Sequence, residues 1–185
     1  MIVKLIYETE RLLLKILDEN NSEKVLDYLI RNKDFFEEFE PQRNEDFYTI
    51  GFQTSELRHD LNYIKEKGML RLWIFNKDNA DKVIGQITFY NIVPFAFLEC
   101  HVGYKSDKDE VRKGIITEAL KESIRIMFEE YEMYRIEAHV MPNNKASISL
   151  LEKVGFINEG ISHKFLEVNG IWEDHMHFAL INDYA

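Results

Sequence analysis

The sequence predicts a fold of the α+β (mixed α/β) class, built as a single domain over residues 1–185. Apolar residues alternate along the chain between the spacing of strands and the spacing of helices. The C-terminal stretch "HKFLEVNGIWEDHMHFAL" places Asn169 and Gly170 between two alternating runs, which is the strongest short hairpin signal. A chain of 185 residues with three prolines and eight glycines also has the length of one domain and shows no linker.

The first third of the chain is predicted to hold one strand and three helices. "RLLLKIL" at 11–17 has the pattern of a strand. Asn21 or Ser22 can cap the helix that follows, Pro41 ends a second short helix, and Gly68 ends a third. These helices are predicted over 23–32, 34–41 and 55–68.

The rest of the chain is predicted to be richer in strands. Three apolar runs follow one another, and "NKDNAD" supplies a turn between the first two. A long helix opens at Gly114, and a shorter helix ends at Gly155 before the final hairpin. The strands are predicted over 69–75, 82–92, 97–104 and 134–141, and the helices over 114–131 and 144–156.

Composition excludes several classes of protein. The formal net charge is -10 and the pI is near 5.1, so binding to nucleic acid, which needs a basic face, is not expected as the main activity. Cys100 is the single cysteine, which excludes an internal disulfide and a multi-cysteine zinc site. The N-terminal stretch is interrupted by charged residues, so we expect no signal peptide, no membrane span and a cytoplasmic location.

The stretch "EVRKGIITEAL" at 110–120 places two cations and a glycine where a helix begins. Free backbone N–H groups at a helix start, together with the positive end of the helix dipole, bind anions. Gly114 would let a bulky anion approach the backbone. The alternative is a surface basic pair, Arg112 and Lys113, before a frayed helix start.

"VRKGIITEAL", followed by "YRIEAHVMPNNKASISLLEKVGF", resembles the GCN5-related N-acetyltransferase (GNAT) superfamily. The resemblance is narrower to its branch of ribosomal-protein N-terminal alanine and serine acetyltransferases, and "ETERLLLK" and "NGIWEDHMHFAL" extend it over almost the whole chain. It implies a GNAT fold, in which a mixed sheet of about seven strands is splayed between its fourth and fifth strands and flanked by about four helices. It also implies acetyl-CoA as the co-substrate, wedged into the gap.

The resemblance assigns the cofactor contacts residue by residue. The pyrophosphate would bind the backbone of the glycine loop, although Val111 and Ile116 depart from the usual polar and small residues of that loop. Pantetheine would pair like an extra strand with main-chain groups beyond "HVGY", with Ser106 as a further candidate, and Asn144 would bind the cofactor arm or only cap its helix. The predicted cofactor-binding residues are Val102, Tyr104, Arg112, Lys113, Gly114, Ile115, Ile116, Thr117 and Asn144.

The resemblance also indicates which residues move protons. Many relatives use a tyrosine four residues before the glycine of "EKVGF" as the acid, but that position is Leu151 here. Ser147 matches the serine that takes the role in the ribosomal branch, although it could merely form a local bond in its helix. The position of the family's base falls on Cys100, a poor base that core burial explains as well. Glu99 and His101 are therefore the leading candidates for the base, followed by Glu137, Glu167 or a water.

The predicted activity is acetyl transfer to a primary amine, either a protein N-terminus of the ribosomal kind or a small cationic amine. The alternative is a non-catalytic acyl-CoA-binding module. Five acidic residues at 37–46 are expected beside the acceptor channel, where they would favour cationic partners. His175 and His177 share a strand face, but with Asp174 on the other face they make an incomplete ligand set, so no metal site is predicted. A homodimer remains an option.

Overall fold

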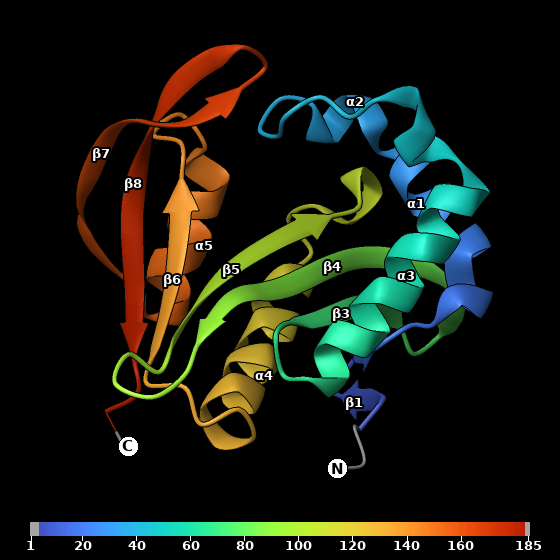
Figure 1. The fold of residues 1–185 in the computed structure, drawn as a ribbon, viewed down its shortest axis with the longest axis horizontal. Helices are drawn as coiled ribbons and strands as arrows, with labels where there is room; N and C mark the ends of the chain where they lie inside the picture. Colours follow the sequence, from blue (N-terminus) through green and yellow to red (C-terminus); the bar gives the residue numbers. More distant parts are fainter. Residues whose placement is uncertain (1–3, 184–185) are drawn as a thin grey trace.

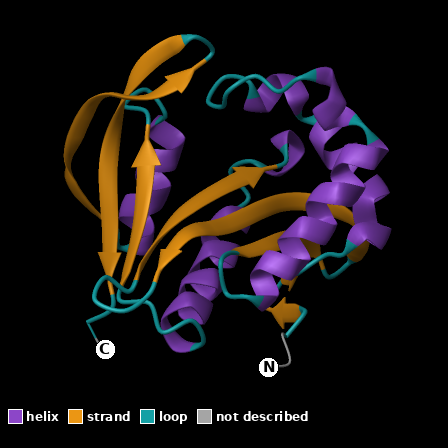
Figure 2. Cartoon of the chain, viewed as in Figure 1, coloured by secondary structure: helices purple, strands orange, loops and turns teal. Residues whose placement is uncertain are grey.

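The computed structural model describes residues 4–183, which form a curved sheet of eight strands with helices on both faces (Figures 1 and 2). The spatial order of the strands is β1-β2-β3-β4-β5-β6-β8-β7. The strands are β1 Ile6–Glu8, β2 Leu12–Lys15, β3 Leu70–Asn76, β4 Asn79–Val93, β5 Glu99–Ser106, β6 Arg135–Val140, β7 Ile157–Val168 and β8 Ile171–Ile181.

Five α-helices accompany the sheet in the described part of the chain, as many as the sequence pattern predicts and one more than the approximate count that the resemblance implies. Short 3-10 turns at Glu19–Asn21, Glu45–Tyr48 and Lys108–Glu110 precede three of them. The helices are α1 Ser22–Arg31, α2 Lys33–Phe36, α3 Ile50–Lys65, α4 Ile115–Glu129 and α5 Lys145–Val154.

The predicted elements are present, with three differences at their boundaries. The extra strand, β1, is three residues long and buries only Tyr7, so it lacks a pattern long enough to recognise. Helix α3 begins at Ile50, earlier than the predicted 55, because the Thr49 hydroxyl caps it by accepting from the Phe52 N–H at 3.3 Å. Helix α2 ends at Phe36, well before Pro41.

The sheet separates between β5 and β6, which are the fourth and fifth strands once the unpredicted β1 is left out, as the family resemblance predicted. Every other pair of neighbouring strands is antiparallel, whereas β5 and β6 are parallel. They pair only where Glu99–His101 meet Arg135–Glu137, and the two strands then diverge (Figure 1). The half of β5 that follows His101 therefore has an edge that β6 does not cover.

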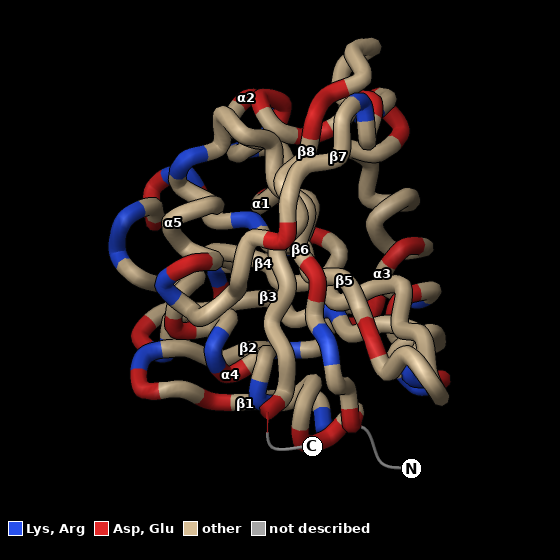
Figure 3. The backbone as a smooth tube through the Cα atoms, turned by 90° about the vertical axis from the view of Figure 1, so that its left-hand side faces the viewer, with Lys and Arg blue, Asp and Glu red and all other residues tan. Residues whose placement is uncertain are grey.

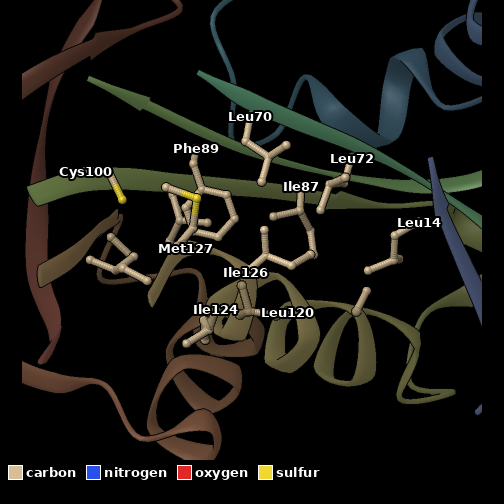
Figure 4. Packing of buried hydrophobic residues seen from close by; sticks show 14 of the residues in the cluster. Leu14, Leu70, Leu72, Ile87, Phe89, Cys100, Leu120, Ile124, Ile126 and Met127 are labelled. Atoms are coloured by element: carbon tan, nitrogen blue, oxygen red, sulfur yellow. The ribbon is translucent and has the colours of Figure 1, made fainter. Parts of the chain in front are cut away.

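Two layers of apolar side chains hold the helices to the sheet. The larger core lies between the sheet and α4, where Leu72, Phe89 and Leu120 meet (Figure 4). A smaller core lies under α1 and α3 and includes Tyr28 and Trp73. Strand β3 is buried on both faces and contributes to both cores, which explains its nearly continuous apolar sequence.

Charged residues of both signs are distributed along the chain (Figure 3). Acidic residues outnumber basic ones, 33 to 23, yet Figure 3 shows basic and acidic positions interspersed along the backbone. Among the described residues, none of the helices has both the length and the apolar content needed to cross a membrane.

Candidate active site

A cavity of about 930 Å³ lies against the sheet face that carries α1 and α3, and it reaches into the gap between β5 and β6. Five residues predicted from the sequence line it: His101, Val102, Tyr104, Asn144 and Ser147. Glu99 and the glycine loop at 112–117 are not part of its wall. The predicted residues therefore fall into two places, the cavity and a loop at the start of α4.

Two hydroxyl groups meet at the gap between the separated strands. Tyr104 on β5 and Ser147 in the first turn of α5 lie 2.6 Å apart, hydroxyl oxygen to hydroxyl oxygen, and either can be the donor. The side-chain oxygen of Asn144 accepts from the Ser147 N–H at 3.1 Å, so Asn144 does cap α5. This cap uses only the amide oxygen of Asn144 and leaves its Nδ2 donor for another partner.

Tyr104 contributes more than the main-chain groups for which it was predicted. Its side chain crosses to α5, and burial raises the pKa of its phenol to about 12, against a smaller lowering by the bond to Ser147. The phenol therefore stays protonated at neutral pH. Leu151, at the position of the tyrosine that many relatives use, is fully buried in the core.

The glycine loop has an unusual backbone shape. Gly114 has φ +77° and stands just before α4, in the left-handed region that glycine adopts without strain. Arg112 also has a positive φ of 64°. Gly114 and the two cations before it are exposed, whereas Ile115 turns its side chain into the core. Ile115 can therefore offer an anion only its backbone.

Arg11 and Glu118 fix the loop from the side of β2. Glu118 in the first turn of α4 accepts from Arg11 Nε at 2.6 Å and from the Thr9 hydroxyl at 2.6 Å. Arg11 Nη1 in turn donates to the carbonyl oxygen of Lys113 at 3.1 Å. Burial raises the pKa of Glu118, but the bonds from Thr9 and Arg11 outweigh burial and leave this pKa below its usual value. Glu118 is therefore ionised at neutral pH.

Asp107 fixes the start of the segment that leads from β5 into the glycine loop. Its side chain is fully buried and accepts from Arg31 Nε at 2.8 Å and from the Asp109 N–H at 3.0 Å. Burial raises the pKa of Asp107, but these two bonds outweigh burial and leave this pKa below its usual value. Asn32 adds a bond from the Lys108 N–H at 2.9 Å, so the loop is tied to the C-terminal end of α1.

The structure separates the candidates for the base. Cys100 is fully buried in the main core, and burial, with smaller contributions from the nearby carboxylates, raises the pKa of its thiol to about 12. It cannot act as a base at neutral pH. Glu99 lies where β5 and β6 still pair and is not part of the cavity wall.

His101 does line the cavity, and it lies beside Glu137 and His139 on β6. Its Nε2 is 3.8 Å from Glu137 Oε2, and His139 Nε2 is 3.5 Å from the same oxygen. Burial raises the pKa of Glu137, but the net shift is downward, and the bond from Arg135 at 2.6 Å is the main cause of that lowering. Burial, reinforced by the other two histidines nearby, lowers the pKa of His139 to about 4, so this ring is neutral at pH 7.

Sequence reasoning missed His139 as a member of this group. The alternation in "YRIEAHVM" held the signal, because residues two apart on a strand point to the same face. Ile136, Ala138 and Val140 are buried in the core, so Glu137 and His139 face the other side. His177 on β8 is the cross-strand partner of His139, and their ring centroids are 4.3 Å apart.

Two further sequence candidates lie apart from this group. Glu167 is exposed on β7 and does not line the cavity. Asp174 binds the His163 ring at 2.8 Å and the Lys164 N–H at 2.9 Å, which places it away from His175 as predicted. His175 is buried on the cavity side.

The acidic segment at 37–46 lies differently from the expectation. Of its five acidic residues, only Glu40 lines the cavity, where it binds Lys105 Nζ at 2.5 Å. Glu45 is paired with Lys33 at 3.3 Å. Arg43 and Arg71 also line the cavity, so its wall carries both signs of charge. The expected acidic channel is therefore not formed, because only one of the five acidic residues lines the cavity and that residue is paired with a lysine.

The chain is similar to known acetyltransferases over most of its length. Residues 11–157 match the model of the acetyltransferase (GNAT) domain. A Bacillus subtilis (strain 168) protein named probable N-acetyltransferase YjcK is 36% identical over 166 residues, covering 90% of this chain and 91% of that protein. The crystal structure of ribosomal-protein-S5-alanine acetyltransferase from Vibrio fischeri superposes with a TM-score of 0.93 at 30% identity over 98% of both chains. Mycobacterium smegmatis RimJ in complex with CoA-disulfide gives 0.86 at 25% identity, over 93% of this chain and 82% of that one.

Proposed function

The chain belongs to the GNAT family of acetyltransferases, and we propose that it acetylates the N-terminal amine of a protein at the gap between β5 and β6. The resemblance drawn from the sequence motifs is thereby confirmed, and with it an N-acetyltransferase that uses acetyl-CoA. This supports the enzyme over the non-catalytic module. The acceptor and the roles of individual residues are the proposed part.

The residues present suit acetyl-CoA, which supplies the acetyl group as an activated thioester. Beyond His101, β5 has an edge that β6 leaves uncovered, and an extended amide chain can pair with such an edge. Gly114 and the first N–H groups of α4 suit a pyrophosphate, because those N–H groups have no partner within the helix. We assign Val102, Tyr104 and Asn144 to bind the pantetheine arm of the cofactor. The residues assigned to bind its phosphates are those of the glycine loop, Arg112, Lys113, Gly114, Ile115, Ile116 and Thr117.

The proton-handling groups lie on two sides of the gap. We assign His101 Nε2 as the group that accepts the proton of the acceptor ammonium, and the carboxylate of Glu137 lies 3.8 Å from it. We assign the Ser147 hydroxyl as the group that donates a proton to the departing sulfur. Its hydrogen-bond partner is the Tyr104 hydroxyl at 2.6 Å. One group therefore removes a proton on the sheet face, while the other supplies one at the start of α5.

A protein N-terminus is favoured over a small amine by two observations. The Vibrio fischeri relative, which covers nearly the whole chain, is named for the alanine of a ribosomal protein. The cavity of about 930 Å³ has room for several residues of an extended chain and carries both signs of charge. A polyamine site would instead need an excess of acidic groups, and Glu40 is already paired with Lys105.

The test is an assay of thiol release from acetyl-CoA across a panel of acceptors. The panel contains peptides with free alanine or serine N-termini, the same peptides already acetylated, polyamines and aminoglycosides. We expect release only with the free peptides, rising between about pH 6 and 9 because only the neutral amine attacks. Release with polyamines alone would overturn the acceptor assignment, and no release from any acceptor despite acetyl-CoA binding would favour the module.

A further inference from the structure

Three side chains of the kinds that bind metal ions converge beside the cavity, which His101 and His139 line. One ring nitrogen of His101, one ring nitrogen of His139 and one carboxylate oxygen of Glu137 all lie within 4.8 Å of one another. We propose that His101, Glu137 and His139 form a binding site for a divalent transition-metal ion, with Zn²⁺ as the preferred ion. Two imidazoles and one carboxylate are a common ligand set for zinc when a fourth position stays open.

The sheet itself brings the three ligands together. Glu137 and His139 stand two residues apart on β6 and therefore share a face, and His101 is the cross-strand partner of Glu137. In a tetrahedral zinc site the ligand atoms are about 3.3 Å apart, as follows from bonds of roughly 2.0–2.2 Å. The two distances to Glu137 Oε2, 3.8 and 3.5 Å, lie within a small side-chain rotation of that spacing.

Neighbouring groups orient the ligands toward one point. Arg135 Nε binds Glu137 Oε1 at 2.6 Å, which leaves Oε2 as the oxygen that faces the two rings. Asn91 Nδ2 lies 3.4 Å from His101 Nδ1, and a flip of this amide would present its oxygen to the ring instead. With the oxygen presented, Nδ1 carries the proton and Nε2 is free for an ion. Such outer partners are typical of metal sites.

Two buried ring nitrogens provide a second observation. Among the described residues, Nε2 of His139 and Nε2 of His177 are buried and form no hydrogen bond, although Glu137 Oε2 lies 3.5 Å from the first. Buried polar atoms almost always have one, so each such atom requires an explanation. A metal ion bound to His139 satisfies the first. The ring centroid of His177 lies 4.3 Å from that of His139, but His177 is not one of the three converging groups.

The site overlaps the place assigned to the acceptor amine. An ion on His101 Nε2 would block the nitrogen that takes the acceptor proton, so metal and acceptor would exclude each other. The glycine loop is not part of the cavity wall, so the phosphate contacts of acetyl-CoA should be unaffected by the metal, whereas the cofactor arm, assigned to Val102, Tyr104 and Asn144, shares the cavity with the ion. The proposed ion would act as an inhibitor and would not be required for the chemistry.

Metal binding can be measured without any assay of activity. The tag-free protein would be titrated with ZnCl₂ by calorimetry and with CoCl₂ by visible absorption, since a four-coordinate Co²⁺ site has a characteristic spectrum. We expect one ion per chain and loss of both signals in Glu137→Gln and in His139→Asn. His163→Asn, which removes an exposed histidine bound to Asp174, is the matched control and should bind as the wild type does.

The outcomes separate this proposal from the proposed function. Unchanged zinc affinity in His139→Asn and Glu137→Gln, or less than half an ion per chain, would overturn the site. Retained stabilisation by acetyl-CoA would show that the two variants are folded, and His101→Asn offers a third variant if one is not. Acetyl transfer with no metal binding would leave the enzyme assignment standing, whereas stoichiometric zinc binding without acetyl transfer would support the site alone.

Discussion

The hydroxyl oxygens of Tyr104 and Ser147 lie 2.6 Å apart across the gap where β5 and β6 separate. The tyrosine reaches this point from the sheet, whereas Leu151, at the position where many relatives carry a tyrosine, is core. Burial holds the pKa of the Tyr104 phenol near 12, so this group remains a donor at neutral pH. The pair therefore brings two hydroxyls to a place where the resemblance predicted one.

Ser147→Ala should lower kcat by roughly 10²-fold while leaving the affinity for acetyl-CoA nearly unchanged, because an acid acts mainly in the transition state. Tyr104→Phe should lower kcat by less, since it removes the partner of the acid and keeps the acid itself. Steady-state kinetics of both variants and of the double variant would test this. If the two losses multiply in the double variant, the hydroxyls act independently and the pairing has no role in the reaction.

Gly114→Glu should abolish the stabilisation of the protein by acetyl-CoA. A carboxylate at this position would repel the phosphates, and a non-glycine residue would be strained at φ +77°. Saturation at a hundredfold excess over the Kd should add about 2.7 kcal/mol to the wild-type free energy of unfolding. Thermal melting with and without acetyl-CoA measures the difference.

Gly170→Glu is the matched control for that experiment. Gly170 also has a positive φ, 81°, and a Cβ there would meet open space, so the variant carries the same charge and a similar backbone strain. It lies in the turn between β7 and β8, away from the loop. Acetyl-CoA should still raise its melting temperature, and a loss in both variants would mean that the effect reports strain and not the anion site.

Asp107→Asn should destabilise the protein by on the order of 2–4 kcal/mol at pH 7, because it leaves Arg31 without its buried partner. The folded-state pKa of Asp107 is lowered, so its contribution is fully present above the ordinary pKa of 3.8 and is lost as the pH falls through the lowered value. Urea unfolding of wild type and variant should therefore differ at pH 7 and converge in acid. Asp81→Asn, at an exposed pair with Lys24, should change little at either pH.

The sequence predicted most of the fold and about half of the site, and the division has a physical origin. Backbone features depend on local residue types, so Gly114 and the cap at Asn144 were predictable one by one. Contacts between strands depend on register, which no local pattern determines. The meeting of Tyr104 with Ser147 and of His101 with Glu137 and His139 arises from where β5 and β6 stop pairing.

The acidic segment at 37–46 shows the same limit for charge. The sequence places five acidic residues together, but their partners lie far away in the chain: Glu40 binds Lys105 on β5. The negative net charge of the whole chain therefore does not extend to the cavity, whose wall carries both signs of charge. Side-chain pairing across the fold decided that.

Cys100 should be unreactive in the folded protein, and its removal should leave the pH dependence of turnover unchanged. The thiol is fully buried, and burial raises its pKa to about 12, so it stays protonated at pH 9, where an ordinary cysteine is largely ionised. Labelling by a soluble thiol reagent should therefore proceed only through unfolding, and acetyl-CoA should slow it further. Cys100→Ala should cost about 1–2 kcal/mol of stability through lost packing. Rapid labelling at pH 9, or an altered pH profile in Cys100→Ala, would instead return this residue to the candidates for the base.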